Sequence, residues 1–145
     1  MRIPALHAAT IAAALALSGA ALHAQAAPPA AAAPFDVVEA SVADVEAALH
    51  SGAVTCHVLV QDYLDRIDAY DKNGPAINAI IVVNPDALAV ADSLDDVTRH
   101  GGKTGPLHCI PVIVKDNYQT KGLQTTGGSL AFKGFKPDRD AFVVA

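Results

Sequence analysis

The stretch Leu107–Val114 constrains the fold of this 145-residue chain more than any other segment. Ile110 and the run Val112–Val114 make it almost continuously apolar, which is the pattern of a strand covered on both faces. Pro111 has no N–H to donate, so this strand should begin late or lie at an edge. Because a covered strand needs neighbours in its sheet, the segment predicts an α/β core.

The other expected elements are one strand and several helices. A short β-branched run, Ala79–Val83, predicts the second strand. Capping residues and apolar periodicity predict the helices: one capped by Ser41 and ended by Ser51-Gly52, one from Thr55 to about Tyr70, one from Asn84-Pro85 to about Thr98, a short one after Ser129, and the beginning of another over Asp140–Ala145. The first two should pack as an antiparallel pair, because a short turn joins them.

These elements do not close a core. Two strands alone are marginally stable, and the chain stops inside its last expected helix with no C-cap. The expectation is the N-terminal part of a larger α/β domain with a mixed sheet covered by helices, truncated before completion.

The N-terminus has the pattern of a secretory signal peptide. Residues 1–33 contain 16 alanines and a single charge, Arg2. An apolar core spans residues 8–17, and Ala24-Gln25-Ala26 fits a small-x-small cleavage site. We therefore expect a signal peptide over 1–26, a Pro/Ala linker over 27–36 and a folded fragment over 37–145, in a periplasmic or secreted product. An uncleaved anchor or an Ala-rich helix is the alternative, although the core is short for a membrane span.

Charge and cysteine content narrow the possible functions. Cleavage after Ala26 would leave nine basic residues against fifteen acidic ones, a net charge of −6 without a basic patch. Nucleic-acid binding therefore has no electrostatic basis, and no stable membrane anchor is expected after cleavage. Export permits a disulfide between Cys56 and Cys109, but two buried free thiols are favoured. Neither Cys56-His57 nor His108-Cys109 has metal-ligand spacing, so no metal site is expected.

The residues after the apolar stretch could carry chemistry. Gly105–Asn117 reads GPLHCIPVIVKDN, so a strand delivers Lys115 into a polar turn. A lysine becomes a base only where burial disfavours its ammonium form. The alternative is that Lys115 is a structural residue at the end of a strand, whose aliphatic stem carries the ammonium group into solvent.

This stretch resembles the amidase signature family, whose members read G-P-L-H-G-I-P-x-x-x-K-D-N and then T-T-x-G-S. The second element is present as Thr125–Ser129, and the likeness covers essentially 37–145. It implies hydrolysis of a carboxamide through a Ser–cis-Ser–Lys triad without a cofactor. Lys115 matches the triad lysine, the base for a bridging serine that deprotonates a nucleophilic serine. Thr126, Gly127, Gly128 and Ser129 match a segment that can line the substrate pocket.

The resemblance also sets limits. Both triad serines belong to a later segment of the family's chain, so this chain alone should be inactive; Ser129 is expected to be a helix cap. Cys109 stands where the family usually has Gly, and would be strained if that position requires a positive φ. Two alternatives stay open: an aminoacyl-tRNA amidotransferase component, against which the signal peptide argues, and a small exported binding module with a structural lysine. The particular small-molecule or peptide amide and the oligomeric state stay undetermined.

Overall fold

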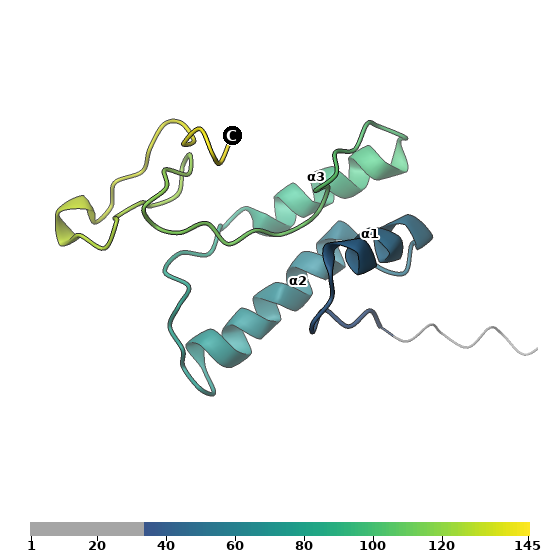
Figure 1. Ribbon diagram of the computed structural model, residues 1–145, viewed down its shortest axis with the longest axis horizontal. Coiled ribbons are helices and arrows are strands. Elements are labelled where there is room, and N and C mark those ends of the chain that lie inside the picture. The colour runs from purple at the N-terminus through teal and green to yellow at the C-terminus, as the bar shows by residue number, and fades with distance from the viewer. Residues whose placement is uncertain (1–33) are drawn as a thin grey trace, which may run out of the picture. The chain divides into compact units, whose positions relative to one another are not determined.

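The computed structural model describes residues 34–145, so the expected signal peptide and most of the linker lie outside the described residues. The elements follow in the order α1 (Val42–Ser51), α2 (Cys56–Arg66), the π-helix η1 (Ile67–Lys72), α3 (Ala87–Arg99) and the 3-10 helix η2 (Leu130–Phe132). Figure 1 shows α1, α2 and α3 gathered together, with the chain after α3 running on as irregular backbone apart from the short coil of η2.

Helix α1 begins and ends at the expected residues. The Ser41 hydroxyl accepts the Asp44 N–H at 3.2 Å, and the Asp44 carboxylate accepts the Ser41 N–H at 2.9 Å, which completes a capping box. At the other end, Gly52 has φ +73°, the left-handed conformation that glycine adopts without a Cβ clash. The capping signals therefore fixed both ends of this helix.

Helix α2 also begins as expected, because the Thr55 hydroxyl accepts the Val58 N–H at 3.2 Å. Leu59 on its inner face is fully buried. The helical path continues through η1 to Lys72, two residues beyond the expected end near Tyr70. Asp71 then fixes the following loop, because its Oδ1 accepts the Ala79 N–H at 2.6 Å. The Asp71–Lys72 hydrogen bond holds the pKa of that carboxyl below its ordinary value.

Helix α3 begins slightly later than the Asn84-Pro85 signal predicts. Asn84 Oδ1 accepts the Asp86 N–H at 3.0 Å, which forms a turn before the helix rather than its cap. The first helical residue is Ala87 and the last is Arg99, one beyond the expected end at Thr98. An asparagine turn and an asparagine cap have the same sequence signature, which explains the shift.

The main helical neighbour of α2 is α3 rather than α1. The two helices run side by side in opposite directions in Figure 1. Two apolar clusters lie between the elements. Val45, Ala48, Val54 and Leu59 form the first, against which Ile110 packs; Cys56, Ala91 and Cys109 form the second. The prediction that the first two helices form the antiparallel pair is therefore wrong, because α2 packs chiefly against α3.

The expected mixed sheet is not formed within residues 34–145, where the structure contains no strand. Neither Ala79–Val83 nor Leu107–Val114 has a ladder partner in this part of the chain. Residues 106–109 form a turn and 110–115 have no regular secondary structure, with Ile113 80% exposed. Strand prediction from apolar runs assumes a paired backbone, and these two segments do not pair with each other.

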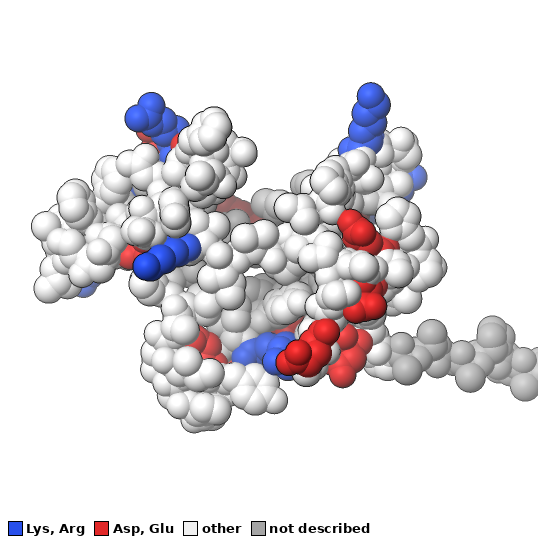
Figure 2. Space-filling model, viewed as in Figure 1, with Lys and Arg blue, Asp and Glu red and all other residues white. Residues whose placement is uncertain are grey.

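The last segment differs from expectation in the same way. Residues 140–145 form a single turn, in which the Val144 N–H bonds to the Ala141 carbonyl at 2.8 Å, instead of the start of a helix. Ser129 caps η2 as expected. Among the described helices, none is long and apolar enough to cross a membrane. On the face drawn in Figure 2, the Lys and Arg side chains lie apart from one another rather than in one basic patch.

Candidate functional site

Asp116 organises the loop that contains the predicted pocket residues. Its Oδ1 accepts the Thr126 N–H at 2.9 Å, and Oδ2 accepts the Thr126 hydroxyl and, at 3.4 Å, the Gly128 N–H. The Asp116 carbonyl accepts the Gly127 N–H at 3.0 Å. One residue therefore bonds to three successive loop residues and holds the Thr126–Gly128 backbone beside the end of the Lys115 segment.

The electrostatics of Asp116 follow from these contacts. The Thr126 hydroxyl, followed by the backbone N–H groups of the loop, holds the pKa of the Asp116 carboxyl below its ordinary value of 3.8. Hydrogen bonds to the charged form favour that form. Asp116 is therefore an anion at neutral pH, directly beside the lysine in the chain.

The structure places the predicted site residues near one another. Lys115 is exposed, Thr126 and Ser129 are half-buried, and Gly127 and Gly128 are exposed with φ +58° and +79°. Ser129 Oγ accepts the Ala131 N–H at 3.3 Å, so its hydroxyl serves η2 as predicted. The pocket expected to bury Lys115 is not closed by residues 34–145.

Sequence reasoning missed Asp116 as an organising residue, because in the sequence it is only one member of an abruptly polar turn after the apolar run. A carboxylate that precedes a Thr-Thr-Gly-Gly loop by about ten residues is a weak signal, because any nearby polar residue could satisfy that loop. Only the fold brings the two segments together.

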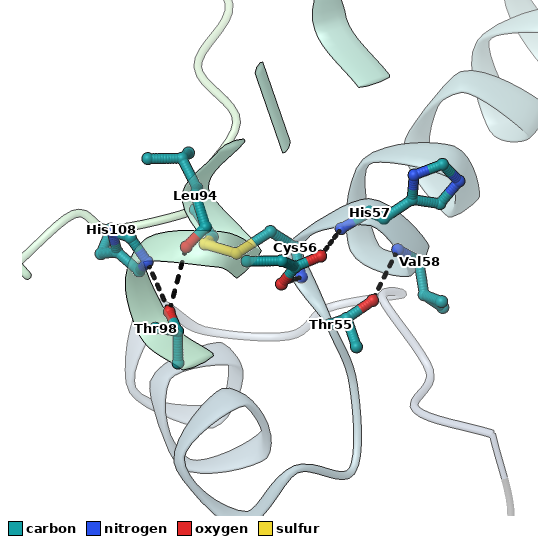
Figure 3. The surroundings of a disulfide bond; sticks show 9 residues. Thr55, Cys56, His57, Val58, Leu94, Thr98 and His108 are labelled. Carbon is teal, nitrogen blue, oxygen red and sulfur yellow. Dashed lines mark hydrogen bonds between the residues drawn. A yellow bond between two sulfur atoms is a disulfide. The ribbon is translucent and has the colours of Figure 1, made fainter. Parts of the chain in front are cut away.

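Cys56 and Cys109 form a disulfide with a Cα–Cα distance of 5.2 Å, and both residues are buried. The favoured expectation of two free thiols is therefore wrong in this structure. Spacing along the chain carries no information about this pairing, since 53 residues separate the cysteines. Figure 3 shows the bond between the start of α2 and the segment after α3, with His108 beside it.

The disulfide lies within a group of possible metal ligands. The donor atoms of Cys56, His108 and Cys109 all lie within 4.8 Å of one another. Thiolates are the forms of cysteine that bind metals, and both sulfurs are joined to each other here. The His108 Nε2 atom lies 2.9 Å from the Thr98 hydroxyl. In the structure, these residues form a disulfide and a hydrogen-bonded link to Thr98 of α3.

Cys109 has φ +64°. A Cβ in this left-handed region meets the following carbonyl oxygen, a clash that glycine avoids. The sequence raised this strain as a possibility for a cysteine at a usual glycine position. The structure places Cys109 in that conformation, immediately before Ile110 and the segment that leads to Lys115.

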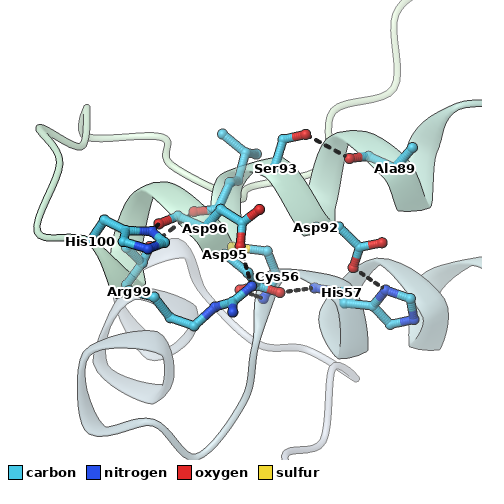
Figure 4. A network of polar contacts seen from close by, with 11 residues as sticks. Cys56, His57, Ala89, Asp92, Ser93, Asp95, Asp96, Arg99 and His100 are labelled. Carbon is cyan, nitrogen blue, oxygen red and sulfur yellow. Dashed lines mark hydrogen bonds and ion pairs between the residues drawn. The ribbon is translucent and has the colours of Figure 1, made fainter.

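Carboxylates of α3 secure the start of α2 (Figure 4). Asp95 accepts the Cys56 N–H at 2.8 Å and the His57 N–H at 3.0 Å. These are two of the N–H groups that a helix leaves without a partner in its first turn. Asp92 approaches His57 Nδ1 at 2.7 Å, but both side chains are exposed. The disulfide is thus attached to a helix end that α3 already holds.

The fold and the Lys115 segment define a class of protein: the Amidase family model matches residues 58–145, and this chain belongs to that family. It is 42% identical over 107 residues to a putative amidase of Schizosaccharomyces pombe, covering 73% of this chain and 18% of that protein. It is 35% identical to a glutamyl-tRNA(Gln) amidotransferase subunit of Halorhodospira halophila, covering 72% of this chain and 21% of that protein.

Solved structures give the same result. The native peptide amidase from Stenotrophomonas maltophilia matches with a TM-score of 0.72 and 45% identity, over 77% of this chain and 23% of that chain. The described helices and loops therefore have the conformation of the corresponding part of an amidase. The chain spans about a fifth of the length of the curated relatives it matches.

Proposed function

We propose that this chain is the N-terminal portion of an exported amidase that hydrolyses a carboxamide C–N bond. Lys115 is the base of a Ser–cis-Ser–Lys relay, and the two serines stand outside these 145 residues. The supporting observation is the segment Gly105–Asn117, which has the family's lysine motif and lies next to Thr126–Gly128 through the contacts of Asp116.

The proposed reaction assigns each group a step. Neutral Lys115 accepts a proton from the bridging serine, which takes a proton from the nucleophilic serine as that oxygen attacks the amide carbonyl. The amine leaves with a proton returned through the relay, and water then hydrolyses the acyl-enzyme. Thr126–Ser129 lines the substrate side of the pocket. Proton acceptance by neutral Lys115 requires further residues to cover its side chain, because that side chain is exposed in residues 34–145.

A chimeric enzyme tests this role of Lys115. Residues 37–145 replace the matching part of the Stenotrophomonas maltophilia peptide amidase, and the host's amidase activity is measured. The chimera should be active, and Lys115→Ala should lower kcat by about a hundredfold or more. Lys121→Ala is the matched control and should leave kcat unchanged. A folded chimera in which Lys115→Ala keeps full activity contradicts the proposal.

Export is the second part of the proposal. Two observations support it: the signal-peptide pattern of residues 1–26 and a buried disulfide, which persists in oxidising compartments. Fusion of residues 1–36 to a periplasmic reporter enzyme should give export and a mature N-terminus at Ala27. Retention of the unprocessed fusion in the cytosol contradicts export while leaving the amidase assignment untouched.

A component of an amidotransferase is the second candidate, because glutamyl-tRNA(Gln) amidotransferase subunits from three bacteria are 34–38% identical to this chain. The signal-peptide pattern and the higher identity to the peptide amidase favour the exported hydrolase. A third candidate, a binding module with a structural lysine, predicts that Lys115→Ala alters the unfolding of the chain. The export experiment distinguishes the exported hydrolase from the amidotransferase component. The chimera distinguishes these two enzymes from the binding module.

A further inference from the structure

The disulfide lies close to Lys115 along the chain. Cys56 is the first residue of α2, and Cys109 is the last residue of the turn that precedes the irregular segment 110–115. Both half-cystines are almost fully buried, at 1% and 5% exposure. The bond therefore joins the core of the helical cluster to the start of the segment that ends at Lys115.

The backbone conformation of Cys109 indicates what the disulfide restrains. Members of the amidase signature family usually carry Gly at this position, and Cys109 has φ +64°. A residue with a Cβ is disfavoured there and would relax toward negative φ if nothing held it. The disulfide joins that same Cβ, through sulfur, to α2. Compared with relatives that carry Gly here, position 109 thus lacks the conformational freedom of glycine and has a covalent restraint instead.

Noncovalent contacts hold the same turn. The His108 N–H bonds to the Gly105 carbonyl and the Ile110 N–H to the Leu107 carbonyl, each at 3.1 Å. The His108 ring approaches the Thr98 hydroxyl of α3 at 2.9 Å, as Figure 3 shows. Ile110 packs on the cluster around Leu59. The turn is therefore fixed to α2 by a covalent bond and to α3 by a hydrogen bond.

The other end of the segment is fixed at Asp116 by the loop contacts with Thr126 and Gly128. Between these two ends, residues 110–115 form no strand and Ile113 is 80% exposed. Ile110 packs on the cluster around Leu59, whereas Pro111, Val112 and Ile113 after it are exposed. The position of Lys115 is consequently set by its two ends, of which the Cys109 end is the one attached to the helical core.

We propose that the Cys56–Cys109 disulfide is a positioning tether, which holds the left-handed turn at Cys109 and thereby sets the place of Lys115. Cys56 and Cys109 are positioning residues that act through the backbone. The catalytic meaning of the tether rests on the proposed function of Lys115, whereas its structural effect does not.

The test compares the intact 145-residue chain with two variants. Cys56→Ser removes the tether and leaves a Cβ at the left-handed position. Cys56→Ala combined with Cys109→Gly removes the tether and restores the residue that tolerates positive φ. Thiol titration of the denatured, unreduced chain should find no free thiol. Two free thiols, or thiols that bind a stoichiometric zinc ion, would overturn the proposal.

Amide hydrogen exchange and tryptic cleavage measure the turn and the lysine separately. In Cys56→Ser, exchange at the His108 and Ile110 amides and cleavage after Lys115, relative to Lys121, should rise about tenfold. The double variant should recover part of this protection. Exchange at Leu59 within α2 monitors the helical core. An equal rise at Leu59 and Ile110, or no recovery in the double variant, would show a merely global effect and overturn the tether.

The chimeric amidase connects the tether with catalysis. There, Cys56→Ser should lower kcat with little change in KM, because the group that moves acts in the chemical step, and the double variant should restore part of kcat. If the chimera is inactive with Lys115 and both cysteines intact, the proposed function fails. The hydrogen-exchange result still shows whether the disulfide holds the turn at Cys109. If kcat is unchanged in Cys56→Ser, the tether does not position Lys115.

Discussion

The Thr126 N–H donates a hydrogen bond of 2.9 Å to Oδ1 of Asp116, which joins the residue after Lys115 to the glycine-rich loop. The same carboxylate accepts the Thr126 hydroxyl and the Gly128 N–H. This contact pattern places the loop and the lysine segment side by side without a sheet between them. It is the main link between the two parts of the candidate site.

Replacing Asp116 should loosen that loop. In Asp116→Asn the neutral side chain keeps one acceptor oxygen but loses the charge that strengthens these hydrogen bonds. Amide exchange at Thr126 and Gly128 should become about tenfold faster, while exchange in α2 stays constant. Asp138→Asn, at an exposed carboxylate of the same region, is the control. Unchanged exchange at Thr126 would contradict the organising role of Asp116.

Acid should destabilise the described part of the chain. The pKa values of Asp44, Asp71 and Asp116 lie below 3.8, chiefly because of side-chain hydrogen bonds from Ser41, Lys72 and Thr126 respectively. A carboxyl whose pKa is lowered by folding contributes stability above its unfolded pKa and loses that contribution as the pH falls through its folded pKa. The free energy of unfolding in urea should therefore decrease between about pH 5 and about pH 2. An unchanged or rising value over that range would exclude this linkage, and Asp116→Asn should flatten the decrease.

The contact of Asp95 with α2 predicts a capping effect. Asp95→Ala removes the acceptor of the Cys56 and His57 N–H groups and should cost about 1 kcal/mol in urea unfolding. Asp92→Ala removes only the exposed pair with His57 and should cost at most about 0.5 kcal/mol. Equal costs for the two variants would mean that charge near the helix end matters, rather than the specific hydrogen bonds.

Two glycines give a test of backbone conformation without a packing change. An added Cβ would meet nothing within 4 Å at either Gly52 or Gly105, but Gly52 has φ +73° and Gly105 lies outside the left-handed region. Gly52→Ala should therefore destabilise the chain by about 1 kcal/mol, whereas Gly105→Ala should be neutral or slightly stabilising. The unfolding midpoint in urea measures both, and a neutral Gly52→Ala would contradict the capping assignment for α1.

Short sequence patterns were enough to predict several helix ends and the family of this protein. The side-chain caps of Ser41, Thr55 and Ser129 act within three residues of themselves, so the sequence alone indicated where these helices begin. The motif around Lys115 and the Thr-Thr-Gly-Gly-Ser element indicated the amidase family, which the family match to residues 58–145 confirms.

Contacts between distant segments were decided only by the tertiary structure. The pairing of Cys56 with Cys109, the left-handed turn at Cys109 and the contacts of Asp116 with the loop each depend on where two remote segments meet. The apolar run before Lys115 shows the same limit, because a strand exists only when another backbone pairs with it. A sequence states which residues can form a cap, a bond or a ladder, whereas the fold decides which partners come within reach.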